Sequence, residues 1–316
     1  MTQRPGFGAG LAAALLAVVI WGVQFPVAKD AFAQIDPFHI TAIRYLVGTL
    51  ALLPLVLWRE GLSVLRYEGR FASATLHGLI GMCGSPMLVF WGLAHTRPEH
   101  TAIIVSTQPV LTALAEWLVR GRRPARATLL CLLAAVLGAV TVITKWDLAL
   151  VLSPGELKGD LLALGGAICW VSYTLSAERY PAWSSVKFTT LTLIPGTIAT
   201  LCIVAWGDFN GWLVPPTPLQ LQAAWPELVY LSFIGVLVAM LAWNAGLARI
   251  GALNAMLLLC LFPVITFAVR YAQGQRFTAL ELGGATLVVG ALAVNNLYQR
   301  RLASQAGSDF SEEVKK

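Results

Sequence analysis

Long apolar runs separated by short polar stretches make up almost the whole chain. Each run is about 20 residues long, which is the length an α-helix needs to cross the hydrocarbon core of a bilayer. The pattern therefore predicts an all-α membrane protein with ten transmembrane helices. The predicted spans are residues 8–28, 38–58, 72–94, 101–119, 126–144, 160–178, 187–206, 226–246, 252–272 and 280–298.

An internal repeat organises these runs. The segment Gly92–Ala125 recurs at Gly246–Ala279, and the other spans align at similar shifts. The sequence thus predicts a five-helix repeat over 1–150 and a second over 151–299, followed by a polar tail, 300–316, that we expect to be disordered. Because five is an odd number, the second repeat would enter the membrane from the opposite side, so the two repeats would be inverted.

Composition and charge place the chain in a membrane. With 57% hydrophobic and 12% charged residues, the apolar side chains exceed what a soluble core can bury. Most of the 22 Lys and Arg residues fall in loops on the N-terminal side of the predicted bilayer. This bias predicts cytoplasmic termini and a multi-pass protein of the cell inner (plasma) membrane. These loops account for the net charge of +6, so no nucleic-acid partner is expected.

The first run resembles a signal peptide, but it is too long and carries Trp21, Gln24 and Pro26, so we interpret it as a retained helix. The five cysteines all lie in apolar spans and include no C-x-x-C pair, which favours packing roles. We therefore expect no metal site and no cofactor. Gly283 and Gly290 in the tenth span, matched by Cys131 and Gly138 in the fifth, predict a close-packing seam between these two spans.

Three segments carry a resemblance to a known family. They are WGVQFPVAK at Trp21–Lys29, TAIRYLVGTLALLPL at Thr41–Leu55, and the repeated Gly-Leu-Ala segments with their mid-span prolines. With these segments the chain resembles the EamA family of the drug/metabolite transporter superfamily, which implies a transporter and, commonly, an exporter. The family's Gly-Glu-Arg motif is replaced around Arg122 and Gln275, so no role of its glutamates carries over to these positions.

Pro109 and Pro263 occupy equivalent positions in the two copies and are predicted to form gating bends. Each proline removes a backbone N–H, which would free the carbonyl of Val105 or Leu259 at mid-membrane depth. The alternative is a tolerated kink that packs on neighbouring helices.

Aromatic and amide side chains inside the spans are predicted to line a substrate cavity, because such rings combine apolar faces with polar handles. Packing, interhelical hydrogen bonds and, for Trp91, a place in the interfacial belt remain alternatives. His77 would also suit proton exchange. The predicted cavity residues are Trp21, Gln24, His77, Trp91, Gln108, Trp170, Tyr173, Trp243, Asn244 and Asn254.

Ionisable residues within the spans are few. Arg44 lies six residues into the second span and aligns with Lys187, which is compatible with an anchor that snorkels outward or with an anion contact. No mid-membrane cluster of Arg or Lys is evident, so we expect an uncharged aromatic cavity. His95, Glu99 and His100 lack the spacing of a zinc protease motif, and a surface turn is favoured.

These observations favour a secondary transporter over an enzyme. No P-loop is present, so an ion or solute gradient would supply the energy, with protons as a candidate coupling ion. The expected activity is export of small organic metabolites, such as amino acids or related amphiphilic compounds, by alternating access in a monomer or homodimer. The alternatives are a membrane-embedded lipid or sugar transferase, and a sensor or scaffold that does not transport.

Overall fold

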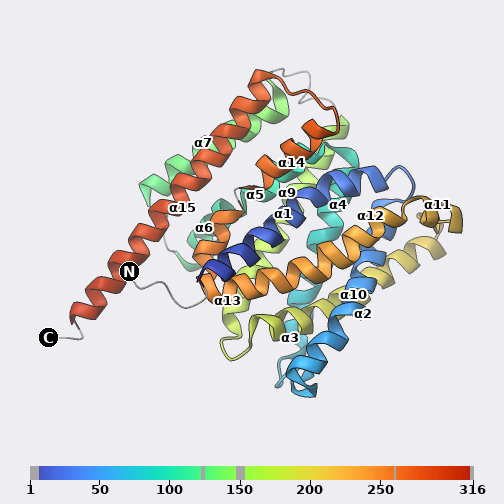
Figure 1. Cartoon of the computed structure of the whole chain (residues 1–316), viewed down its shortest axis with the longest axis horizontal. Helices are drawn as coiled ribbons and strands as arrows, with labels where there is room; N and C mark the ends of the chain where they lie inside the picture. The colour runs from blue at the N-terminus through green and yellow to red at the C-terminus, as the bar shows by residue number, and fades with distance from the viewer. Residues whose placement is uncertain (1–6, 122–124, 147–153, 260, 314–316) are drawn as a thin grey trace.

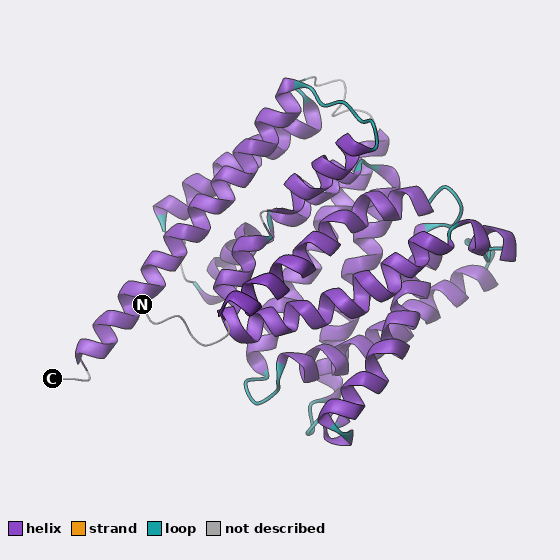
Figure 2. Cartoon of the chain, in the orientation of Figure 1, coloured by secondary structure: helices purple, strands orange, loops and turns teal. Residues whose placement is uncertain are grey.

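A computed structural model describes residues 7–121, 125–146, 154–259 and 261–313. Within these ranges every regular element is helical (Figure 2). The α-helices are α1 (Phe7–Ala31), α2 (Pro37–Glu60), α3 (Phe71–Gly78), α4 (Ser85–His95), α5 (Pro98–Ser106), α6 (Gln108–Arg120), α7 (Arg126–Thr144), α9 (Pro154–Ser176), α10 (Ser185–Phe209), α11 (Pro218–Ala223), α12 (Trp225–Val229), α13 (Ala239–Leu258), α14 (Leu261–Ala272) and α15 (Ala279–Glu313). Two 3₁₀ turns, η1 (Leu62–Leu65) and η3 (Ala177–Arg179), and two π-helices, η2 (Leu79–Gly84) and η4 (Tyr230–Val238), complete the described elements.

Seven helical segments are long and apolar enough to cross a membrane, and two shorter apolar helices accompany them. The seven coincide with predicted spans one to three and five to eight. Large apolar side chains such as Leu50, Ile198 and Leu118 point outward and are more than half exposed, as expected for a surface that faces lipid. The chain is therefore a multi-pass membrane protein, while the count of ten spans stays a prediction.

The fourth and ninth predicted spans are interrupted rather than continuous. In the first half α5 ends at Ser106 and α6 begins at Gln108. In the second half α13 runs through the predicted boundary between the eighth and ninth spans to Leu258, and α14 begins at Leu261. The expected boundary at 246–252 was wrong because these residues, although they include two glycines, contain no proline to end a helix.

Helix α15 continues to Glu313, so the structure describes residues 300–313 as helix where a disordered tail was expected. No proline interrupts this stretch, and an established helix extends more easily than a new one nucleates.

The π-helices lie at corresponding places in the two halves. The repeat shift of 154 residues puts η2 on 233–238, which is inside η4. A π-helix widens the helical turn and commonly marks a functional position. In this chain the two π-helices run directly into α4 and α13.

Helices of the first half pack against helices of the second half (Figure 1). The repeat alignment pairs α1 with α9 and α4 with α13. In the structure α1 packs on α13, which is the counterpart of α4, and α4 packs on α9, which is the counterpart of α1. The repeat therefore relates these two contacts to each other. This is the pattern expected of two similar units related by an approximate two-fold axis.

Helices α7 and α15 lie side by side along one edge of the molecule, as the predicted seam requires (Figure 1). The close approach is made by Gly138 and Gly284: a Cβ added to either would fall 2.7 Å from the other's carbonyl oxygen. Nothing lies within 4 Å of a Cβ added to Gly283 or Gly290. The seam therefore exists, but one residue away from the predicted Gly283.

Candidate functional site

A cavity of about 110 Å³ lies where the two interrupted spans meet α1, α2, α4, α9 and η4. Five of the predicted cavity residues line it: Trp21, Gln24, Gln108, Trp170 and Trp243. The structure thus gathers side chains from both halves of the chain around one space.

Two tryptophans form the aromatic wall of this cavity. The ring centroids of Trp21 and Trp243 are 5.4 Å apart, with the rings tilted by 55°. The indole nitrogen of Trp21 donates a hydrogen bond of 3.0 Å to the carbonyl oxygen of Gly235. The Tyr230 hydroxyl donates to the carbonyl oxygen of Ile20 over 2.8 Å. Both bonds tie α1 to the π-helix η4 and fix the wall in place.

At both helix interruptions, residues near the proline line the cavity, and the proline itself does not. Val105 and Gln108 line it from the first interruption, and Leu259 and Phe262 line it from the second. The Leu259 carbonyl, which the missing Pro263 N–H leaves in need of another partner, accepts a 3.1 Å hydrogen bond from the Phe262 N–H. Pro109 stands in the first turn of α6, where its missing N–H costs no helical bond.

Two predicted cavity residues lie in a different place. His77 Nδ1 is 2.9 Å from the hydroxyl of Tyr180. The Tyr173 hydroxyl is 3.1 Å from that of Thr192, and its ring stacks on Phe188 with centroids 5.0 Å apart. Both side chains belong to the packed region between α3, α9 and α10, and neither lines the cavity.

Three further predicted residues are also absent from the described lining. Trp91 packs against Phe38, with ring centroids 5.5 Å apart. Asn244 donates to the Met240 carbonyl in its own helix over 2.9 Å. The side chain of Asn254 falls outside what the structure describes, as does the residue Arg122.

Arg44 corrects the expectation of an uncharged cavity. Its side chain is 5% exposed and lines the cavity instead of snorkelling to the membrane surface. The guanidinium carbon lies 4.3 Å from the ring centroid of Phe90 and 5.2 Å from that of Tyr45. Nε and Nη1 are buried and have no hydrogen-bond partner within the described chain. The only sequence signal for this role was the depth of Arg44 in its span.

The remaining lining residues gave no distinctive signal in the sequence. They include Ser85 and Pro86 at the start of α4, and Val236 and Met240 around the junction of η4 and α13. Small and aliphatic residues of this kind occur on every span, so only the packing of the π-helices identifies those that face the cavity.

A second polar region corrects the expected surface turn at Glu99 and His100. Glu99 is 3% exposed and His100 is fully buried. Both belong to a set of charged and polar residues at one end of the helices, which we call the ion-pair cluster. Its members are Lys29, Thr96, Arg97, Glu99, His100, Lys145, Asp160, Arg270 and Glu281.

Ion pairs in this cluster join the two halves of the chain. Arg97 Nη1 lies 3.0 Å from Glu281 Oε1, and Lys145 Nζ lies 3.1 Å from the same oxygen. Arg270 Nε lies 3.2 Å from Glu99 Oε1. Each acidic partner is 3% exposed, so the carboxylates are largely desolvated, whereas the basic side chains are 24–29% exposed.

His100 occupies the centre of the cluster. Its Nδ1 is 3.4 Å from Asp160 Oδ2, and its Nε2 is 2.7 Å from Arg97 Nη2. The Thr96 hydroxyl donates to Asp160 Oδ1 over 2.7 Å. These contacts connect the start of α5 to α9, which belongs to the other half. The polar groups face one another rather than the cavity, which argues against a hydrolytic role for them.

Lys29 holds the end of α4 to α1. Its ammonium donates hydrogen bonds to the carbonyl oxygens of Leu93, Ala94 and Thr96, at 2.8, 3.0 and 2.8 Å. The last carbonyls of a helix have no intrahelical partner, so a cation placed there satisfies them. No pattern in the sequence indicates this contact, because Lys29 and the end of α4 are more than 60 residues apart.

The ion-pair cluster lies one to two helical turns from the cavity. Lys29 follows the lining residue Phe25 by four positions, and Glu99 precedes Val105 by six, which is about 6–9 Å along a helix. A layer of buried apolar side chains, including Phe25, Phe90 and Ala102, occupies the distance between them. The cavity is thus separated from this end of the molecule by an apolar layer and then a charged one.

Known proteins that resemble this chain are transporters by name. "Uncharacterized transporter YrdR" of Bacillus subtilis is 29% identical over 92% of each chain. "Probable amino-acid metabolite efflux pump" of Salmonella typhimurium is 23% identical over 97% of this chain and all of its own, and the Escherichia coli protein of the same name is 23% identical over 93% and 97%. A solved crystal structure with 22% identity matches 93% of this chain and 99% of its own with a TM-score of 0.67, which shows the fold alone.

The family resemblance found in the sequence is confirmed by a match over both halves. The model described as the EamA-like transporter family matches residues 8–144 and again residues 157–297. These two segments contain every described residue that lines the cavity and every member of the ion-pair cluster except Lys145. The chain is a multi-pass membrane protein that belongs to the EamA-like transporter family.

Proposed function

We propose that this protein is a secondary active transporter that exports small organic solutes, such as amino acids or related amphiphilic compounds, across the inner membrane by alternating access. One observation carries the proposal. The cavity forms where the interrupted spans of both halves meet, and ion pairs between those halves lie one to two helical turns away from it.

The lining of the cavity supports binding of a small solute. Aromatic walls with a few polar groups are typical of small-molecule sites. The cavity volume of about 110 Å³ is smaller than the roughly 300–1,000 Å³ of common ligand pockets. Occupation by a metabolite therefore requires the walls to separate. The interruptions at Thr107 and Leu259 supply backbone positions at which a helix half can pivot.

The ion-pair cluster supports a gate at one face. A charge that loses its partner while it stays buried costs about 3–5 kcal/mol, so a partly separated arrangement that keeps water out is unfavourable. Separation of the halves breaks the Arg97–Glu281, Arg270–Glu99 and His100–Asp160 contacts together and admits water to all of them. A charged layer of this kind favours two discrete states, open and closed, over intermediate ones.

Several details of the proposal come from sequence expectations and from the names of relatives. The export direction and the amino-acid-like substrates agree with the two relatives named as amino-acid metabolite efflux pumps. Ten spans in two inverted repeats, cytoplasmic termini and protons as the coupling ion remain part of the proposal. A monomer or a homodimer is compatible with it.

Flux through purified protein in liposomes tests the function. We expect saturable flux of at least one member of a panel of amino acids, purines and amphiphilic cations, with or without a pH gradient. Trp21→Ala and Gln108→Ala should lower that flux at least tenfold while insertion stays normal. Trp58→Ala is the matched control, because Trp58 on α2 is 81% exposed and lies outside the cavity. No saturable flux for any compound, or equal flux in all three variants, would contradict the proposal.

A further inference from the structure

We infer that the cavity binds the carboxylate group of its solute at Arg44, so that the substrates are monocarboxylates with an apolar or aromatic body. The inference rests on the proposed function in taking the transported solute as the occupant. It adds a chemical class and a recognition residue to that function.

The lining of the cavity carries a positive charge that no acidic side chain in the described lining balances. Arg44 is 5% exposed, and none of the described lining residues is acidic. A buried cation without a counter-ion is costly, and proteins normally pair it with an anion. The rings of Phe90 and Tyr45 provide only partial compensation by cation–π contact. A site of this kind is complementary to a negative group that arrives with a ligand.

Arg44 also has hydrogen-bond donors that a ligand can use. Nε–H and Nη1–H of Arg44 are buried and lack a partner within the described chain, although an arginine can donate five hydrogen bonds. Planar guanidinium groups match the geometry of carboxylates particularly well. A carboxylate seated against one edge of the Arg44 guanidinium would accept from one of these donors and neutralise the charge at the same time.

The surroundings of Arg44 narrow the class of ligand. A single guanidinium suits one negative charge, whereas a polyphosphate or dicarboxylate would bring more charge than the lining can balance. The face of Phe90 and the pair Trp21 and Trp243 offer apolar contact to the body of the solute. The side-chain oxygen of Gln24 is also buried without a partner, so it can accept an N–H from an amino or amide group.

Binding measurements on wild-type protein in detergent test the inference directly. The probes are 3-phenylpropionate and L-phenylalanine, each compared with its primary amide, which has nearly the same shape but lacks the negative carboxylate charge. Tryptophan fluorescence reports occupancy, because three tryptophans line the cavity. We expect each acid to bind at least tenfold more tightly than its amide. Amides that bind as tightly as the acids, or no saturable change with either acid, would overturn the inference.

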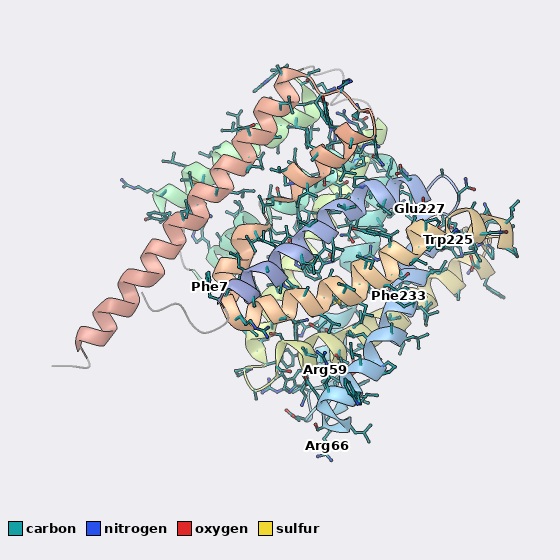
Figure 3. All side chains as sticks on the ribbon, in the orientation of Figure 1. Phe7, Arg59, Arg66, Trp225, Glu227 and Phe233 are labelled. Atoms are coloured by element: carbon teal, nitrogen blue, oxygen red, sulfur yellow. The ribbon has the colours of Figure 1, made fainter. Side chains whose placement is uncertain are left out.

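Variants of Arg44 locate the site. Arg44→Met should weaken binding of both acids by about 10- to 100-fold, the range expected for loss of a hydrogen bond to a charged group. Arg44→Lys should recover part of the loss, because the charge returns without the guanidinium geometry. Arg59→Met is the matched control, since Arg59 is exposed near the end of the same helix (Figure 3). Unchanged acid binding in Arg44→Met would place the anion elsewhere and overturn the assignment.

The comparison between acid and amide needs no variant, so it decides the question even if Arg44→Met does not fold. Failure of the inference can also be distinguished from failure of the proposed function. Liposome flux of amides and cations without preference for acids would leave transport intact and refute the carboxylate site. Tight, Arg44-dependent binding of acids without any flux would refute transport and leave the site intact.

Discussion

Arg270 on α14 donates a hydrogen bond of 3.2 Å to Glu99 on α5, and the two residues come from opposite halves of the chain. If this pair helps to hold one face closed, neutralising Glu99 should favour the open state at that face. We predict that Glu99→Gln raises the rate at which a cysteine at Val105 reacts with an impermeant maleimide added from outside. Each 1.4 kcal/mol by which the variant destabilises the closed state would raise the population of the open state about tenfold.

The exchange variant Glu99→Arg/Arg270→Glu should return labelling toward the starting rate, because it restores opposite charges across the contact. The labelling requires a background in which the native cysteines are replaced. Glu68→Gln is a suitable control, since Glu68 also forms an ion pair but lies in the exposed turn before α3. Equal labelling rates for Glu99→Gln and Glu68→Gln would show that the Arg270 contact does not control access.

Trp21→Phe separates the ring of Trp21 from its hydrogen bond to Gly235. The change keeps an aromatic wall but leaves the Gly235 carbonyl without its donor. We predict a loss of about 1–3 kcal/mol in the free energy of unfolding, the usual cost of an unsatisfied buried group. Denaturant unfolding in detergent measures it. Trp58→Phe, at an exposed position, should change stability by less than about 0.5 kcal/mol. A similar loss in both variants would mean that the hydrogen bond is not the cause.

Gly284→Leu should destabilise the seam between α7 and α15. A Cβ at residue 284 would meet the Gly138 carbonyl at 2.7 Å, so the helices must move apart. We predict a loss of about 1–3 kcal/mol, as found for overpacked contacts. Gly283→Leu is the control with the same chemistry one residue away, where nothing lies within 4 Å. It should not lower the unfolding temperature, and an equal loss in both variants would count against the seam.

The pH dependence of stability should include a contribution from Glu68. Hydrogen bonds from the Lys187 ammonium and from the Trp183 indole hold the pKa of the Glu68 carboxyl below its usual value of 4.5. Because the folded state lowers this pKa, the contribution is present above about pH 4.5 and is lost as the pH falls through the lowered value. The effect should be small, since the pair is exposed.

Glu68→Gln should therefore lower the unfolding temperature near neutral pH and leave it unchanged in acid. Thermal unfolding in detergent from about pH 3 to pH 7 gives the comparison. A difference between the two proteins that persists at the acidic end would indicate lost packing instead of lost ionic contact.

The helical fold could be predicted from the sequence because the bilayer imposes it, whereas the family was inferred from the resemblance of particular segments such as Trp21–Lys29 and Thr41–Leu55. The thickness of the hydrocarbon core sets the length of each run, and the repeat sets the order of the runs. The cavity was predicted in part for the same reason. Trp21, Trp243 and Gln108 are polar or amphipathic groups inside apolar runs, and such groups tend to turn toward the interior of the bundle.

The remaining site residues could not be predicted, because the direction of a side chain depends on tertiary packing. Arg44 and Lys187 align in the repeat but have different environments. Arg44 faces the cavity, whereas Lys187 pairs with Glu68 at the surface. Glu99 was assigned to a surface turn because its loop is polar, and its partner Arg270 lies 171 residues away. No local pattern reports a contact of that separation.

The exchange of helices between the two halves has a consequence for folding. Helix α1 packs its small residues on α13, where Gly246 meets Ala14, and α4 packs on α9, where Gly92 meets Gly159. Neither half contains the partner that covers these faces. A half expressed alone would leave the closest helix contacts unmade, so the two halves form one cooperative unit in spite of their separate sequence repeats. The chain should then unfold in a single transition, with neither half surviving the loss of the other.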